Sequence, residues 1–355
     1  MKAKFILFLL ALVFMISTGA MAQSKTGTTI GQFLLIEPSG RAASMGNAGV
    51  AMYDEIVSAY YNPAAIGQQT GYGVQFTHSL WLADIRYDYA AAALQAGSLG
   101  NLFLSVTSLN SGEIAVRTVS QPLGTGERYT VSNLALGLGY GRQLSDRFSV
   151  GVQLNLIQET IWHSSLKTFA LNVGTIYRLS ENGLRLGASI SNFGLQSGYS
   201  GRDLRIQYDL EPDQFGNNSA LPGEVFTEEY SLPVLFRVGM SWPVQLGKNN
   251  QLLFAADAFH PNDNTESMSA GVEWTLFNVL ALRGGYQNLF QQGQNIFEDV
   301  LLEKDLKQDH EVETGLTIGM GLNFDVENYE FRFDYGWADY GRLDNAQRFS
   351  LGFKF

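Results

Sequence analysis

Apolar and polar residues alternate with a period of two over long stretches of the chain. In RFSVGVQLNLIQE the apolar residues share one face and the polar or small residues share the other. The apolar set is Phe148, Val150, Val152, Leu154 and Leu156. TGLTIGMGLNFD and YEFRFDYGW repeat the pattern. This period indicates β-strands, and segments of this length exceed the usual strand of about five or six residues. They match the roughly 9–11 residues of a tilted transmembrane strand.

About fourteen segments fit this template. They are residues 72–80, 85–96, 99–109, 129–143, 147–160, 166–179, 184–194, 232–243, 251–260, 267–277, 279–288, 313–325, 329–339 and 347–355. In a bilayer the apolar face contacts lipid and the polar face lines a lumen. Arg332 and Asp334 are then tolerable only if the polar face is solvated or internally paired. The sequence therefore predicts an all-β protein, a transmembrane antiparallel β-barrel of about 14 strands.

The links between these segments support the barrel. Several links after even-numbered segments are short, such as SDR, SEN and VEN, whereas the three longest (110–128, 195–231 and 289–312) all follow odd-numbered segments. Long loops then lie on one side and turns on the other, as in an outer-membrane barrel. An even strand count also returns both termini to the side of the turns. The same pattern places the protein in the cell outer membrane, in contact with its lipid.

Both ends of the chain carry features of export. Residues 1–22 have the form of a signal peptide, with Lys2 and Lys4, the apolar run FILFLLALVFMI and the small residues of AMA at its end. Twelve apolar residues are too few for a membrane-spanning helix, which needs about 20. The last residues, RFSLGFKF, end in Phe355. A terminal strand that ends in Phe resembles the signal read by the outer-membrane barrel insertion machinery.

Composition and isolated motifs argue against several functions. The formal net charge is −11, which disfavours nucleic acid because phosphate backbones need clustered Lys and Arg. The histidines are scattered, without metal-ligand spacing: His78, His163, His260 and His310. His163 lies beside Ser164 without an identifiable acid partner. The glycines of LGLGYG have strand spacing, and no helix follows them. We therefore predict no enzyme, no metal site and no cofactor.

Residues 23–70 differ from the rest because they lack a steady period of two. They include SGRAASMGNAGVAMYDEIVSAYYNPAAIG. Such a segment is too irregular to cross lipid, where unpaired backbone groups cost several kcal/mol each, and too apolar for a solvated tail. We predict that it starts on the side of the turns and packs as a plug inside a barrel formed by residues 71–355. Gly40, Gly46 and Gly49 would permit close approach to the wall, and Pro63 would fix a turn. A periplasmic linker is the alternative.

The order FLLIEPSGRAASMGNAGVAM and then YYNPAAIG resembles the N-terminal signature of the PorV/PorQ family. That family is a branch of the FadL-like outer-membrane barrels, with fourteen strands and an N-terminal hatch. The plug motif is Arg41, Met45, Gly46, Asn47, Asn62, Pro63 and Ala64. Tyr61 departs from the Trp that is usual in the family, and a PorV-like or a PorQ-like role both stay open. The resemblance implies association with type IX secretion translocon subunits and with the C-terminal signal domains of cargo proteins.

Three functions follow as hypotheses. The first is a partner-binding component of type IX secretion, the second a FadL-like uptake channel for hydrophobic molecules, and the third a structural outer-membrane protein. The acidic loops at 195–231 and 297–313, the latter able to form a short amphipathic helix, are either docking surfaces or ordinary solvated loops. Pro233 and Pro243 are the candidates for a lateral opening in the wall, because proline removes ladder hydrogen bonds.

Overall fold

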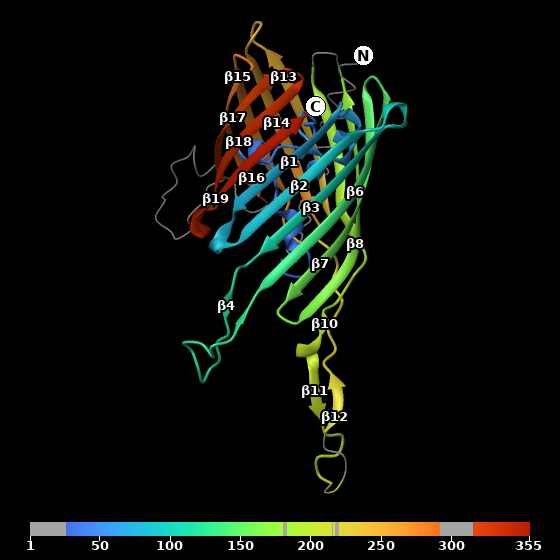
Figure 1. Ribbon diagram of the computed structural model, residues 1–355, viewed down its shortest axis with the longest axis vertical. Coiled ribbons are helices and arrows are strands. Elements are labelled where there is room, and N and C mark those ends of the chain that lie inside the picture. The colour runs from blue at the N-terminus through green and yellow to red at the C-terminus, as the bar shows by residue number, and fades with distance from the viewer. Residues whose placement is uncertain (1–25, 180–182, 215, 217–219, 292–314) are drawn as a thin grey trace, which may run out of the picture.

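The computed structural model describes residues 26–179, 183–214, 216, 220–291 and 315–355. Within these residues, fourteen antiparallel strands form one closed barrel (Figure 1). The strands are β1 (Tyr72–Leu80), β2 (Arg86–Gln95), β3 (Asn101–Asn110), β6 (Val131–Ser145), β7 (Phe148–Ile161), β8 (Ser164–Arg178), β9 (Arg185–Gly194), β13 (Leu235–Gln245), β14 (Gln251–Pro261), β15 (Ser267–Leu276), β16 (Leu280–Gln291), β17 (Leu316–Val326), β18 (Tyr329–Asp339) and β19 (Asn345–Lys354). The predicted signal peptide and the predicted helix at 297–313 lie outside the described residues.

The strands follow chain order around the barrel, each antiparallel to its neighbours. The first and last strands close it, in a register that runs from Gly73↔Lys354 to Leu80↔Gln347. Tyr72 and Phe355 extend this closure by exchanging backbone hydrogen bonds of 2.9 and 2.8 Å. An all-β fold with about 14 antiparallel strands is therefore confirmed, and the segments predicted from periodicity differ from the strands by a few residues at their ends.

The two ends of the barrel differ. At one end, here called the turn end, short links join β2 to β3, β6 to β7 and β17 to β18, and Phe355 lies there. Two hairpins project from the opposite loop end (Figure 1). One contains β4 (Ile114–Ala115) and β5 (Arg128–Tyr129). The other contains β10 (Ser200–Gly201), η5 (Arg202–Leu204), β11 (Arg205–Tyr208) and β12 (Leu221–Glu224).

Side chains alternate along the strands as the sequence pattern predicts. In β6, Leu136 and Leu138 are exposed on the outside of the barrel, whereas Ala135 is buried. In β18, Phe333 is exposed, while Asp334 is fully buried in the lumen and accepts a 2.8 Å hydrogen bond from Arg332. Of the two alternatives for the face that carries Arg332 and Asp334, solvated or internally paired, the structure shows internal pairing. The outer surface is a belt of apolar side chains, and the inner surface combines polar and small side chains with buried apolar ones such as Phe103 and Ile157.

The N-terminal segment, residues 26–71, lies inside the barrel (Figure 1). Its helices are short: η1 (Gln32–Leu35), α2 (Gly40–Ala43), α3 (Ser58–Tyr61) and η2 (Pro63–Gln68). Three further 3₁₀ turns lie in links between strands, namely η3 (Leu82–Asp84), η4 (Gly97–Leu99) and η6 (Gly341–Leu343). No helix in the described ranges combines the length and the hydropathy required to cross a membrane.

The path of this segment corrects one expectation. We predicted that it starts on the side of the turns, but its first described residues lie at the loop end. There Ile30 donates a 3.0 Å backbone hydrogen bond to Ser231, and the Thr29 hydroxyl donates to Asp263 at 2.5 Å. The segment then runs the length of the lumen to Gly71 at the turn end. Along this path its backbone is satisfied by its own short turns and by side chains of the wall.

The wall is not interrupted at the prolines singled out above. Pro243 lies inside β13 and pairs in regular register with Leu253, and Pro233 precedes the strand. Pairing of β13 with β9 ends at Ser241, so Pro243 has a ladder on one side only and its missing N–H breaks no bond to β9. Register shifts occur instead at Gln143/Ser145, Leu171/Val173 and Met268/Ala270.

Candidate functional site

Arg41 of α2 forms the centre of a buried ionic network in the turn-end half of the lumen. Its Nε and Nη2 donate to the two carboxylate oxygens of Glu273 on β15, at 2.7 and 2.6 Å. Arg283 of β16 donates to the same carboxylate at 2.6 Å and lies 2.7 Å from Asp334 of β18. Burial opposes the charge of Arg41, yet its pKa is raised because Glu273 stabilises the guanidinium. The network joins the N-terminal segment to three strands of the wall.

Met45 and Gly46 lie against two inward-facing glycines of the wall. A Cβ added at Gly271 would come within 2.4 Å of the Met45 carbonyl oxygen, and one added at Gly285 within 2.4 Å of the Gly46 nitrogen. Gly46 itself has φ +68° and would carry a Cβ 2.5 Å from the Tyr286 carbonyl oxygen, so no other residue fits without strain. The Gly46 nitrogen donates to the Thr317 hydroxyl at 2.9 Å. Backbone packs directly on backbone here.

Asn62, Pro63 and Ala64 form a second tight contact, nearer the turn end. The Asn62 side chain caps η2 by accepting from the Ala64 nitrogen at 3.0 Å. Its amide nitrogen donates to the Val50 and Thr175 carbonyl oxygens at 2.8 and 2.9 Å. Pro63 occupies the first turn of η2, where its missing N–H costs nothing, and Ala64 is fully buried.

Wall side chains satisfy several backbone groups of the segment that its own short turns leave unpaired. The Gly40 nitrogen donates to Ser350 at 3.1 Å, and the Val50 nitrogen donates to Asp257 at 2.8 Å. Asn101 donates to two carbonyl oxygens at the end of η2, each at 2.7 Å. Since an unpaired buried backbone group is costly, these contacts explain how a segment with little secondary structure stays packed inside the barrel.

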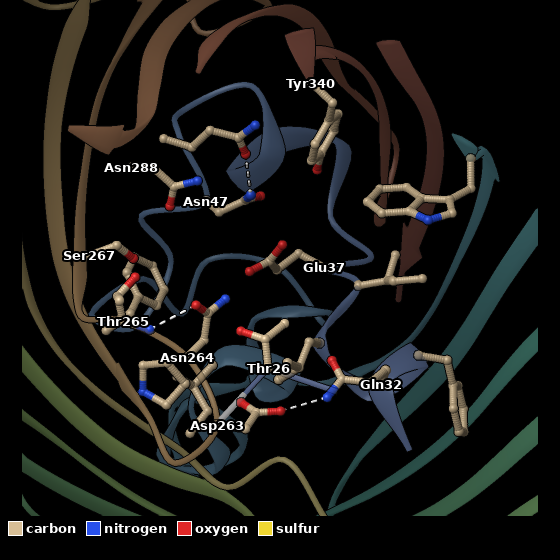
Figure 2. A pocket seen from close by; sticks show the side chains of 18 of the residues that line it. Thr26, Gln32, Glu37, Asn47, Asp263, Asn264, Thr265, Ser267, Asn288 and Tyr340 are labelled. Carbon is tan, nitrogen blue, oxygen red and sulfur yellow. Dashed lines mark hydrogen bonds between the residues drawn. The ribbon is translucent and has the colours of Figure 1, made fainter. Parts of the chain in front are cut away.

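The loop-end half of the lumen holds a cavity of about 750 Å³ (Figure 2). Apolar side chains form much of its wall, namely Phe33, Leu35, Ile36, Trp81, Leu109, Leu235 and Phe259. Three carboxylic side chains also line it, Glu37, Glu159 and Asp263. No Lys, Arg or His is among the described residues that line this cavity. Asn47 of the plug motif is at its edge, where its amide nitrogen donates to Gln287 at 3.1 Å.

Glu37 lies among the side chains of the cavity (Figure 2). It contacts two buried arginines of the wall. Arg348 donates from Nε to the backbone oxygen of Glu37 at 2.8 Å, and Nη2 of Arg237 lies 3.9 Å from its carboxylate. Burial raises the pKa of the Glu37 carboxyl, and the two arginines only partly oppose that shift. Glu37 therefore lines the cavity on one side and contacts the buried arginines of the barrel wall on the other.

The projecting hairpins form a second pocket of about 760 Å³ outside the lumen, with Tyr129, Trp162 and Tyr199 among its lining residues. His163, at the turn between β7 and β8, has an acid partner that sequence reasoning missed. Its Nδ1 lies 2.8 Å from Asp203 of the 195–231 loop, and an Arg202 nitrogen lies 2.6 Å from Nε2. The hydrogen bonds of the described residues include none between His163 and a serine hydroxyl. The pair therefore ties the hairpin to the barrel rim.

Phe355, the predicted insertion signal, is about half exposed on the outer surface, where its ring stacks on that of Tyr72 with a centroid distance of 5.8 Å. Arg41, Met45, Gly46 and Asn47 lie together along one part of the lumen, and Asn62, Pro63 and Ala64 lie together in another. Sequence reasoning missed Glu273, which holds Arg41, and Arg283, which holds Glu273; it also missed Glu37 at the cavity. The signal available for the first two was their position on the lumen face of amphipathic strands.

Among the described residues, no group of three or more His, Asp or Glu is placed to hold a metal ion, and the chain has no Cys.

A family model described as type IX secretion system protein PorV matches residues 19–200, a little over half of the chain. No curated protein was found to match it.

Several solved structures are similar in fold. The Pseudomonas putida toluene transporter TodX is 10% identical with a TM-score of 0.52, over 88% of this chain and 96% of that one. The Ralstonia pickettii toluene transporter TbuX is 12% identical with a TM-score of 0.51, over 90% and 98%. CymD, a monoaromatic hydrocarbon channel, is 12% identical with a TM-score of 0.52, over 90% and 98%. At such identities the similarity concerns the fold alone.

Proposed function

The chain belongs to the PorV family of type IX secretion system proteins, and from this membership we propose that it is a partner-binding component of type IX protein secretion. It acts as a non-enzymatic outer-membrane barrel that associates with translocon subunits or receives the C-terminal signal domains of cargo. The N-terminal segment serves as a permanent plug, and the loop end carries the binding surface. The family match supports this because it spans the plug motif and the strands from β1 to β9.

The β11–β12 hairpin is the part of the loop end that we assign to a partner. It exposes Ile206 and Tyr208. A two-stranded hairpin is marginally stable by itself in water, and contiguous exposed apolar side chains mark interaction surfaces. A partner that covers these side chains would stabilise the hairpin.

A loop replacement tests this role. The Val225 nitrogen donates to the Leu204 carbonyl oxygen at 2.8 Å, so residues 205–224 can be replaced by a Gly-Ser turn without moving the flanking chain. We expect a folded, heat-modifiable barrel that no longer co-purifies with translocon subunits or cargo, and reduced secretion of a cargo reporter.

The matched control removes the tip of the other hairpin, beyond β4 and β5. Thr125 and Val116 are joined by a 2.9 Å backbone hydrogen bond, so residues 117–124 can be replaced in the same way. If β11–β12 is the partner surface, this control keeps both co-purification and secretion. Normal secretion after loss of residues 205–224 would contradict the proposal.

The second candidate is a channel for hydrophobic molecules. The cavity at the loop end, with its apolar wall, and the fold similarity to toluene transporters favour it. Transport would require the N-terminal segment to move, because it fills the turn-end half of the lumen. Uptake of a hydrophobic tracer, measured in the strain that carries the 205–224 replacement, separates the two functions. Normal secretion with altered uptake would favour the channel.

A further inference from the structure

We propose that the cavity at the loop end binds an organic cation, a primary ammonium or guanidinium group carried on an apolar body. This inference stands apart from the secretion role, because it concerns the lumen and not the projecting hairpins. It rests on the sign of the charges around the cavity, on buried oxygen atoms that lack partners and on the aromatic side chains of its wall.

The charge balance of the cavity is the first observation. Glu37, Glu159 and Asp263 line it, and no basic side chain does so among the described residues. Two arginines lie behind the lining: Arg237 and Arg348 contact Glu37, and they also lie over the rings of Phe259 (6.0 Å) and Trp81 (5.1 Å). Glu159 accepts from the Tyr199 hydroxyl at 3.0 Å, and Asp263 accepts from Thr29 and from Gln32 at 2.6 Å. Neither forms an ion pair with a described Lys or Arg. A ligand carboxylate would be repelled here, whereas a cation would be attracted.

Buried acceptors without partners are the second observation. Oδ1 of Asp263 and Oδ1 of Asn47 have no hydrogen bond, although the two residues are only 4% and 6% exposed. Both side chains are drawn at the cavity (Figure 2). Leaving a buried acceptor unsatisfied costs about 1–3 kcal/mol, and an ammonium group brings three donors and no acceptor. The ligand that best completes this set is therefore a donor.

The orientation of the Asn47 amide follows from its neighbours. Gln287 donates from Nε2 to the Asp339 carbonyl oxygen at 3.2 Å, so its Oε1 faces Asn47 and accepts from Nδ2 at 3.1 Å. Asn47 is thereby held with Oδ1 as its remaining polar atom. The assignment of oxygen and nitrogen in this amide thus rests on a chain of two hydrogen bonds.

The apolar part of the ligand has a matching surface. Phe33, Trp81, Phe259 and Tyr340 contribute rings to the cavity. Trp81 and Tyr340 pack edge to face with centroids 5.1 Å apart. Arg348 and Arg237 already lie over the rings of Trp81 and Phe259, so these rings serve the apolar body of the ligand. The volume of about 750 Å³ accommodates a phenyl ring with a short chain.

Three probes of matched shape test the proposal on the full protein in a nonionic detergent: phenethylamine, 2-phenylethanol and 3-phenylpropionate. We expect calorimetry to give the amine a dissociation constant at least about tenfold below that of the alcohol, with the carboxylate weakest. Equal binding of all three probes, tighter binding of the carboxylate, or no binding of the amine would overturn the proposal.

Variants locate the binding in this cavity. Glu37→Gln and Asp263→Asn should each weaken phenethylamine roughly five- to tenfold and leave 2-phenylethanol unchanged. Glu266→Gln is the matched control, an exposed carboxylate in the same loop as Asp263 that does not line the cavity, and it should change neither. Undiminished amine binding in both cavity variants would overturn the assignment of the site. If a variant fails to assemble, the ranking of the three probes on the unaltered protein still decides.

Discussion

The two halves of the lumen are built from the same wall and the same N-terminal segment, yet they differ in packing and in charge. In the turn-end half, Glu273 is paired with Arg41 and Arg283, and Asp334 with Arg332. Glycines such as Gly285 let the backbones touch. In the loop-end half, Glu159 and Asp263 have no described basic partner, and a cavity remains. The chain itself fills the turn-end half and pairs its charges, whereas the loop-end half keeps a cavity with room for a ligand.

The difference shows how a barrel with a chain segment in its lumen can be stable and still have room for a ligand. Buried charges are tolerable when each is matched by an opposite charge, and in the turn-end half Arg41, Arg283, Arg332, Glu273 and Asp334 each have an opposite partner. Unmatched acceptors in the loop-end half cost stability that a ligand can recover on binding. We therefore expect mutations in the turn-end half to act mainly on folding and those in the loop-end half mainly on binding.

The largest expected effect comes from Glu273→Ala, which breaks the ionic network. Arg41 and Arg283 would keep their buried charges without the carboxylate that both contact. The free energy of unfolding should fall by about 3–5 kcal/mol, as measured by urea denaturation in detergent. Glu113→Ala is the control, because it removes an exposed pair with Arg128 and should cost less than about 1 kcal/mol. A similar loss in both variants would contradict the special role of the network.

A pair of neighbouring glycines tests the close contact of the segment with the wall. Gly285→Ala places a Cβ 2.4 Å from the Gly46 nitrogen, whereas Gly284→Ala places one no closer than 4.0 Å to any other atom. The first should cost about 1–3 kcal/mol and the second less than about 0.5 kcal/mol. Denaturation curves of the two variants provide the measurement. Equal midpoints would mean that the segment does not press on the wall at this position.

Cysteine labelling compares the two halves directly. Ser44→Cys lies in the filled half, where the native side chain is fully buried beside Gly319, and Asn264→Cys lies at the exposed edge of the cavity. A maleimide should react with the second site faster by roughly two orders of magnitude, because the first requires local opening. Rapid reaction at Ser44→Cys would rule out the proposed permanent plug.

The smallest effect concerns the pH dependence set by Glu37. Burial raises its pKa above the ordinary value of 4.5, so the folded protein holds this proton at a pH where the unfolded chain has lost it. Stability from this group is present below pH 4.5 and is lost as pH rises through the raised pKa. Glu37→Gln removes the effect. Its melting temperature should therefore rise relative to the unaltered protein between pH 4 and pH 8; a constant difference would contradict the assignment.

The sequence alone was sufficient for the barrel, because strand periodicity is local. Each residue's neighbours two positions away reveal its face, and link lengths reveal which end of the barrel it approaches. The same local pattern placed Arg332 and Asp334 on the inward face and left solvation or internal pairing open. The glycines of the irregular N-terminal segment, Gly46 among them, indicated close approach to the wall.

Only the tertiary structure decided which charges are matched. Arg41 and Glu273 are 232 positions apart, and nothing in the local pattern of either residue selects the other. The local pattern likewise did not determine the path of the N-terminal segment. We predicted that it starts at the turn end, whereas its first described residues lie at the loop end. The cavity depends on that path, because an empty volume is what remains after distant segments have packed. Local alternation therefore determines the wall, and contacts across the lumen determine where it is filled and where it stays open.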